Sequence, residues 1–598
     1  MTPTIEILGN INQNSAKNKD EVFTRLYRYM LRPDLYFIAY KNLYANNGAA
    51  TKGVDNDTAD GFGEEKINKI IDSLRDGTYQ PKPVRRTYIE KKNGKLRPLG
   101  IPTFTDKLVQ EVLKMILEAV YEPTFEKTSH GFRHGRSCHT ALSAIKKEFT
   151  GIKWFIEGDI KGCFDNINHN VLVGLINSKI KDMRLIKLIW KFLKAGYMEN
   201  WKYNETYSGC PQGGIVSPIL SNICLHELDK FVMKLAQDFY KPYDRKYTDE
   251  YYACRVKAAL IRRKINKSEG EDRQKYVEEL RVARAEMLKT PSKSQTDKKI
   301  RYIRYADDFL IGVNGNKEEC VEIKRKLTEF IATFLKMELS EEKTLITHSS
   351  EKARFLGYDV SVRRSGKIKK GTEDTTQRTL NNTVDLSIPL DDKIIPYLFN
   401  KKAVIQKNGE LKPMHRKYLL NCTDFEIVTI YNAELRGLCN YYHLASNFCK
   451  ISYFAYLMEY SCLKTLCNKH KTSIAKFITK HRYDKKWGIP YSNKKGKQVL
   501  TFANYADSKK CTIATDFITR EPIYHSNNKT TFESRLSAKK CEICGTTTAE
   551  SYEIHHVNKV KNLKGKEPWK LVMIAKKRKT LALCKECHYK IHGRVLRK

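Results

Sequence analysis

Two adjacent aspartates, Asp307 and Asp308, lie at the centre of the stretch RYIRYADDFLIGV. The β-rich arms on both sides of this acidic centre predict a hairpin that presents the two carboxylates at its bend. Carboxylates on rigid backbone are preferred ligands of Mg²⁺, and two such ions about 3.5–4 Å apart can support phosphoryl transfer. A site of this kind needs a third carboxylate, and Asp159 at the end of KWFIEGDI is the best candidate. Aspartates are also common turn residues, so the pair alone does not establish the site.

A second group with possible chemistry is formed by four cysteines near the C-terminus. Cys541 and Cys544 form one C-x-x-C pair, and Cys584 and Cys587 form another after a long spacer. This two-pair spacing is typical of a structural zinc site with four thiolate ligands. A small basic segment buries little apolar surface, so bound Zn²⁺ would supply much of its folding free energy.

Histidines are concentrated in the same segment. Of the 15 histidines in the chain, four lie at His555, His556, His588 and His592. The last two are four residues apart, which places them on one face of a helix, where both can contact one metal ion. An isolated histidine is more often a buried structural residue or a surface residue. This clustering favours a second metal site.

The composition indicates what the whole chain binds. Its 598 residues suggest roughly four domains, and 109 Lys and Arg against 68 Asp and Glu give a net charge of +41. A surplus of this size favours nucleic acid as the partner. No run of about 18 apolar residues and no signal peptide is evident, so the sequence predicts a cytoplasmic protein that does not bind membranes. Most of the 16 cysteines should then be reduced.

Several elements must position these groups. The first 80 residues have the periodicity of helices, as in EEKINKIIDSLRDG, and short strands with Pro and Gly follow. A charged stretch at about 237–299 predicts an inserted helical hairpin. Helical runs with basic flanks continue after residue 360, and a basic region with interleaved aromatic residues begins near residue 476.

The motifs together are more specific than any one of them. KKNGKLRPLGIP, GDIKGCFDNI, SGCPQGGIVSPILSNICLHELD and YADD occur in the order typical of a reverse transcriptase, and LSEEKTLITHSS and ARFLGY follow them. Over its whole length the chain resembles the proteins encoded by group II introns. The resemblance implies a multidomain α+β protein with the fingers and palm of a right-hand polymerase at 1–360, including the insertion. It also implies a helical thumb, or maturase domain X, at 361–475. The positive charge of the region at 476–540 predicts that it binds DNA.

The same resemblance assigns roles to individual residues. Asp159, Asp307 and Asp308 would hold two Mg²⁺ ions, and Phe164 would lie beneath the sugar of the incoming dNTP and exclude a 2′-hydroxyl. The remaining substrate-binding residues would be Lys91, Arg97 and, behind them, Arg85 at the triphosphate, Gln212 near the template, and Lys343 as an acid for the leaving pyrophosphate. Without the PLGIP context, the basic residues would suit a solvated surface equally well, and Phe164 would suit a core.

The C-terminal segment, 541–598, resembles an HNH endonuclease of the ββα-metal type. This resemblance implies that His556 is the general base and that His555, His588 and His592 bind one Mg²⁺ or similar ion. One departure is that KRKTLALC lacks the central Asn of many HNH domains; Asn558 and Asn562 are the nearest asparagines.

The implied activity is that of a reverse transcriptase, maturase and DNA endonuclease that acts with intron lariat RNA on double-stranded target DNA, using the nicked strand as primer. A homodimer on the RNA is compatible with the resemblance. Two alternatives remain at this point. One is a binding-only splicing factor with relic catalytic domains, and the other is a reverse transcriptase serving defence or diversification. Intact YADD, HH and paired cysteines favour the multifunctional enzyme over the first, and the thumb and HNH segments favour it over the second.

Overall fold

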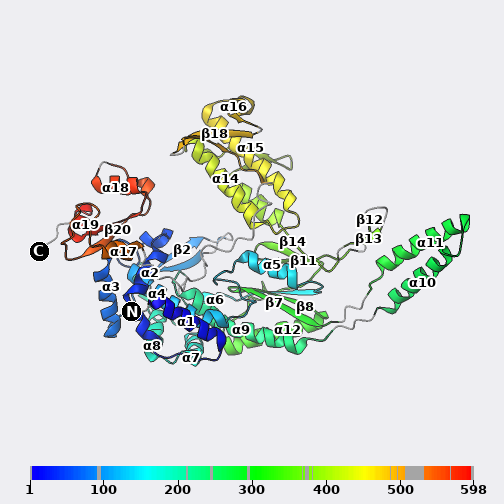
Figure 1. Cartoon of the computed structure of the whole chain (residues 1–598), viewed down its shortest axis with the longest axis horizontal. Coiled ribbons are helices and arrows are strands. Elements are labelled where there is room, and N and C mark those ends of the chain that lie inside the picture. Colours follow the sequence, from blue (N-terminus) through cyan, green and yellow to red (C-terminus); the bar gives the residue numbers. More distant parts are fainter. Residues whose placement is uncertain are drawn as a thin grey trace.

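The computed structural model describes most of the chain. It covers residues 3–90, 94, 96–210, 213–242, 247–292, 297–365, 368–370, 376–379, 381–484, 486–493, 496–505, 531–565 and 567–593. Lys91, Gln212 and part of the predicted 476–540 region lie outside these residues. In Figure 1 a mixed α/β body carries a helical unit (yellow), a projecting pair of helices (green) and a small C-terminal unit (red).

An antiparallel four-stranded sheet in the order β7-β8-β4-β9 lies at the centre of the body. Its strands are β7 (Lys299–Tyr305), β8 (Asp308–Asn314), β4 (Trp154–Asp159) and β9 (Ile346–His348). Successive residues of β8 contact different cores, because Leu310 belongs to one hydrophobic cluster and Ile311 to another. Both faces of this central sheet are therefore buried, and β7 and β8 form the predicted hairpin.

A buried ion pair connects the central sheet to a helix beneath it. Arg304 of β7 and Asp229 of α9 (Ser217–Phe239) are both fully buried, and their Nη2 and Oδ2 atoms are 2.6 Å apart. The same guanidinium donates to the side chains of Asn222 and Ser129, and Tyr302 donates to Asp229. A cation in this environment is tolerated because its donors are matched by acceptors.

The body also contains a group of packed N-terminal helices and a second sheet. The long helix α4 (Phe104–Tyr121) is buried along nearly its whole length, and α1 (Thr4–Lys17) and α2 (Pro33–Leu43) lie against it. The second sheet has the order β3-β2-β5-β6. Its strands are β3 (Leu96–Ile101), β2 (Val84–Glu90), β5 (Tyr197–Glu199) and β6 (Lys202–Asn204).

The helical unit follows the strands β10 (Ala353–Phe355), β11 (Tyr358–Val362) and β14 (Val384–Ser387). Its main helices are α14 (Asp424–Tyr441), α15 (Ile451–His470) and α16 (Ile474–Lys480). Strands β18 (Lys486–Asn493) and β19 (Gly496–Thr501) pack onto α14. Trp487 and Phe502 are buried there in the same core as the helices.

The predicted insertion forms a helical hairpin of α10 (Asp249–Ile265) and α11 (Gly270–Lys289). It projects away from the body in Figure 1. Only Ala258, Ile261 and Ala283 are buried within its two helices, so most of its surface faces solvent.

The C-terminal unit is built from α17 (Thr531–Ser537), β20 (Tyr552–His556), α18 (Pro568–Lys576), β21 (Thr580–Cys584) and α19 (Lys585–Ile591). Its two strands are antiparallel, and β1 (Phe62–Gly63) from the N-terminal region extends them into a three-stranded sheet. The two ends of the chain are therefore joined by backbone hydrogen bonding.

Among the residues described, no helix is both long enough and apolar enough to cross a membrane.

Asp229→Asn should destabilise the body by about 3 kcal/mol, because Arg304 would remain buried without a counterion. Urea unfolding followed by circular dichroism would measure the change. Glu338→Gln is the matched control: it breaks the Lys161–Glu338 pair, whose side chains are 67% and 73% exposed, and should cost no more than about 1 kcal/mol. Equal effects of the two variants would contradict a supporting role for the buried pair.

Candidate functional sites

The three predicted carboxylates meet at one end of the central sheet. Asp159 is the last residue of β4, and it pairs directly with Asp308, the first residue of β8. Asp307 occupies the turn before β8. Because β4 and β8 are hydrogen-bonded neighbours, the backbone itself fixes the spacing of these side chains.

The tight turn that carries Asp307 is supported from below. Ala306 has a left-handed backbone (φ 56°), an uncommon conformation for a residue with a side chain. Its carbonyl accepts from Arg304 Nη1 at 2.9 Å. A Cβ on Gly131 would come within 2.2 Å of the Ala306 nitrogen, and a Cβ on Gly158 would overlap the Phe309 ring. Glycine at these two positions allows the neighbouring segments to approach the turn.

Asp307 and Asp308 both have a raised pKa. Desolvation raises the pKa of Asp308 to about 7, and the negative charges of Asp307 and Asp159 add to this effect. Burial also raises the pKa of Asp307, again with a contribution from Asp159. Lys343 donates to Asp159 at 2.6 Å, and this contact raises the pKa of Lys343. Such mutual repulsion is relieved when a cation binds, so this group suits hard divalent ions.

The other described substrate-binding candidates differ in burial and in their contacts. Phe164 is half-buried in α6 (Cys163–Asn166), with its ring edge-on to Phe132 at 6.1 Å. Arg97 is exposed on β3 and lies close enough to lower the pKa of Asp307 by its charge. Arg85 donates instead to the carbonyls of Lys52 and Gly53.

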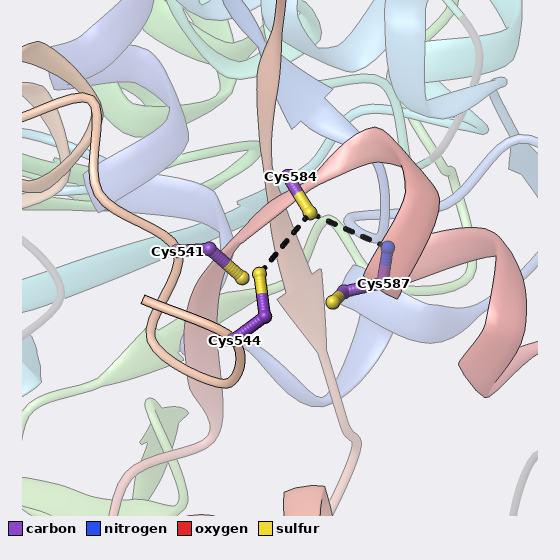
Figure 2. Close-up of side chains that lie close together, drawn as sticks. All are labelled: Cys541, Cys544, Cys584 and Cys587. Atoms are coloured by element: carbon purple, nitrogen blue, oxygen red, sulfur yellow. Dashed lines mark hydrogen bonds between the residues drawn. The ribbon is translucent and has the colours of Figure 1, made fainter. Parts of the chain in front are cut away.

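The four paired cysteines converge on one point. All four Sγ atoms lie within 4.8 Å of one another, and Cys544 and Cys584 are 3.8 Å apart. Figure 2 shows the sulfurs directed toward a common centre from the loop at 541–544 and from β21 and α19. A Zn–S distance of about 2.3 Å implies about 3.8 Å between sulfurs in a tetrahedron. Burial opposes ionisation of Cys541, but nearby backbone N–H groups lower its pKa to about 7. The arrangement suits Zn²⁺.

A second cluster lies in the same unit and combines three of the predicted histidines with an aspartate from the other end of the chain. The ligand atoms of Asp60, His555, His588 and His592 all lie within 4.8 Å of one another. Burial would lower the pKa of His588, but Asp60 and Glu553 raise it to about 9. Burial lowers the pKa of His592. Together these ligands suit a transition metal or a similar divalent ion.

His556 is adjacent to this cluster but points elsewhere. Its side chain is only 9% exposed, and its Nε2 atom lies 3.2 Å from the carbonyl oxygen of Tyr44. Burial lowers its pKa, so the ring is neutral at physiological pH. A neutral imidazole is the form that a general base requires.

The structure also brings in residues that the sequence analysis did not select. Asp60 is one, and Glu553 is another, since it lies 2.7 Å from His588 Nδ1 and orients that ring. Glu553 could have been found from its strand, because it is two residues from His555 and shares a face with it. Asp60 is 496 positions from His556, and the residues around it show no metal-binding pattern by which it could have been found.

Comparisons with known proteins extend over the whole chain. Family models for a reverse transcriptase (RNA-dependent DNA polymerase), a type II intron maturase, and an AI2M/AI1M-like HNH endonuclease match it. They match residues 89–251 and 280–360, 381–528, and 541–588, respectively. The chain is 59% identical over 592 residues to the group II intron-encoded protein LtrA of Lactococcus lactis subsp. cremoris, covering 98% of this chain and 99% of that protein. An uncharacterised 91 kDa protein in the cob intron of Schizosaccharomyces pombe is 36% identical, covering 98% of this chain and 72% of that protein.

Among solved structures, telomerase from Candida tropicalis in complex with a fragment of telomeric RNA aligns with a TM-score of 0.33. It is 13% identical, covering 70% of this chain and 59% of that one. Similarity at this level adds nothing to the sequence matches.

Cys587→Ser should reduce the zinc content of the purified protein by about one equivalent, because a tetrahedral site loses one of its four ligands. Mass spectrometry of the metal content would measure this, and proteolysis should become faster within the C-terminal unit. Cys449→Ser, which removes an exposed cysteine outside the cluster, should change neither quantity. Full zinc content in the Cys587 variant would contradict a four-cysteine site.

Proposed function

Because the chain belongs to the group II intron-encoded proteins, we propose that Asp159, Asp307 and Asp308 are the metal-binding residues of its RNA-directed DNA polymerase. The protein is a reverse transcriptase, an intron maturase and an HNH endonuclease in one polypeptide, with RNA as a partner. The matches to both enzyme families favour this function over that of a binding-only splicing factor.

The observation that carries the polymerase assignment is the pairing of Asp159 with Asp308 across adjacent strands. Two Mg²⁺ ions bound there would activate the primer 3′-hydroxyl and neutralise the triphosphate. Arg97 is exposed beside this group and is available for the triphosphate, with Lys91 as its predicted neighbour. Arg85 would act indirectly, by holding the segment at Lys52 and Gly53.

The remaining polymerase residues would position the substrates. Phe164 follows Asp159 closely in the chain, and its ring would exclude the 2′-hydroxyl of a ribonucleotide. Gln212 would contact the template side. Lys343 is anchored by Asp159 and would donate a proton to the leaving pyrophosphate.

In the C-terminal unit, we propose that His556 is the general base of the endonuclease and that His555, His588 and His592 bind its divalent ion. The four cysteines would bind Zn²⁺ and hold the unit together. Target DNA, dNTPs and the intron lariat RNA are then the partners, and the thiolate site requires a reducing compartment such as the cytoplasm. A dimer on the RNA is compatible with these roles but is not required by them.

The proposed function also divides the chain into four domains. Fingers and palm extend to about residue 360, the thumb to about 475, the DNA-binding region to about 540, and the endonuclease to the C-terminus. The net charge of +41 supports binding of RNA and DNA that weakens steeply with salt. The thumb would stabilise folded intron RNA by phosphate contacts, while the RNA itself performs the splicing reaction.

Asp307→Asn should abolish cDNA synthesis, because the site loses a metal ligand, while intron splicing stays near the wild-type rate. Primer extension on an RNA template and a splicing assay on the same preparation would measure both. Asp238→Asn changes an exposed carboxylate of α9 and should leave both activities intact. Loss of splicing in a folded Asp307 variant would contradict the separation of the two functions.

His556→Ala should reduce nicking of the target DNA at least about a hundredfold, because a general base is removed. Splicing and primer extension should be unchanged. The Asp307→Asn variant is the reciprocal control, since it should nick DNA but not extend the primer. Nicking that persists at the wild-type rate in the His556 variant would refute its assignment as the base.

A further inference from the structure

The carboxylate of Asp60 occupies the centre of the histidine cluster. Its Oδ2 atom lies 2.8 Å from His592 Nε2 and 3.2 Å from His588 Nε2, and its Oδ1 atom lies 3.1 Å from His555 Nδ1. Oδ1 also accepts from the backbone N–H of His556 at 2.7 Å. One side chain of the N-terminal region thus contacts every histidine of the proposed endonuclease site.

The ring of His555 provides a second, independent sign of a ligand. Its side chain is only 4% exposed. Among the described residues, its Nε2 atom has no hydrogen-bond partner, and its Nδ1 atom has the 3.1 Å contact with Asp60 but no hydrogen bond. Buried polar groups are almost always paired, so this ring indicates a missing partner. A divalent ion satisfies such a nitrogen directly.

Asp60 is held in this position by the backbone around it. Gly61 donates to the carbonyl of Ile554, and Phe62 and Gly63 pair with β20. A Cβ on Gly63 would come within 2.6 Å of the Tyr552 carbonyl oxygen, so only glycine allows this approach. Phe62 is fully buried, and Tyr40 contacts Phe532 of α17 edge-on at 5.0 Å. The contact is therefore a packed interface between the two ends of the chain.

The same interface covers the proposed base. The N-terminal segment that supplies Tyr44 lies over His556, and the imidazole contacts a backbone carbonyl there. An ion pair between Lys585 and Glu65, at 3.0 Å, adds a further contact between the two ends of the chain. His556 stays buried while this contact persists.

We propose that Asp60 is a fourth, internal ligand of the endonuclease metal ion, and that it closes the site until the C-terminal unit separates from the N-terminal region. This inference rests on the proposed endonuclease function. An ion that also binds Asp60 has one coordination position fewer for substrate than an ion bound by the three histidines alone. Asp60 and a scissile phosphate are both anionic oxygen ligands, so they compete for that position.

The first test is Mn²⁺ binding to the full chain, measured by calorimetry with the zinc site filled. An Asp307→Asn, Asp308→Asn background removes binding at the polymerase site. In this background, Asp60→Asn should weaken Mn²⁺ binding at least about tenfold, because an anionic ligand is lost. Asp55→Asn is the matched control, because Asp55 lies on the same segment but pairs with Lys82, and its affinity should be unchanged. Equal affinity in all proteins would overturn the proposal.

The second test is nicking of duplex target DNA at saturating Mn²⁺, where Asp60→Asn should act at least about fivefold faster, because the open state is more populated. If nicking instead falls together with affinity, Asp60 is a permanent ligand and the closing role is wrong. Retention of one equivalent of zinc would demonstrate that the C-terminal unit is still folded.

A charge reversal tests the closed state without touching a metal ligand. Lys585→Glu faces Glu65 with a like charge and should raise nicking a few fold, and adding Glu65→Lys should return it to the wild-type rate. A fall in nicking that the second change does not restore would contradict the closing role. A wrong endonuclease assignment would give a different result from a wrong closing role. Nicking would then be absent from every variant and from the wild type, or it would be unaffected by His556→Ala.

Discussion

The buried pair of Arg304 and Asp229 is the constraint on which the proposed polymerase site depends. The guanidinium binds Asp229 on α9, and the same group holds the carbonyl of Ala306 just before Asp307. The strained turn is thus fixed to a helix in the core rather than to solvent-exposed atoms. A buried ion pair is seldom the most stable arrangement. Here, however, it links α9 to the turn, so the position of the helix determines the position of the Asp307 carboxylate.

The convergence of the three carboxylates was predictable from the sequence because their signals are local. A hairpin with an acidic bend and a strand ending in Asp159 are both properties of short segments, and the cysteine pairs have a spacing of their own. Arg304 was not predictable, since strand alternation gives no reason for a fully buried arginine in RYIRY. Its partner is 75 residues away, on a helix whose packing only the fold determines.

The same limit explains why the cluster of Asp60 and three histidines was only partly predictable. Three histidines in one segment could be identified by their spacing, but Asp60 lies in TADGF, which has no metal-binding pattern. Likewise, Trp487 and Phe502 belong to a basic, aromatic segment of the kind that suits nucleic acid, yet they are buried against α14 and α15. Whether these aromatic side chains are buried depends on the apolar surface of the neighbouring helices. The sequence of the segment itself does not reveal which elements pack against it.

The three-stranded sheet that joins the chain ends has a further physical consequence. β20 is paired on one side by β21 and on the other by β1, so separating the two ends would leave β20 as an edge strand with unsatisfied backbone groups. Phe62 and Phe532, both buried at this contact, would be exposed at the same time. Exposed edges of this kind promote aggregation. A freed C-terminal unit is therefore a state that the protein can sustain only while another molecule covers the same strand and aromatic surface.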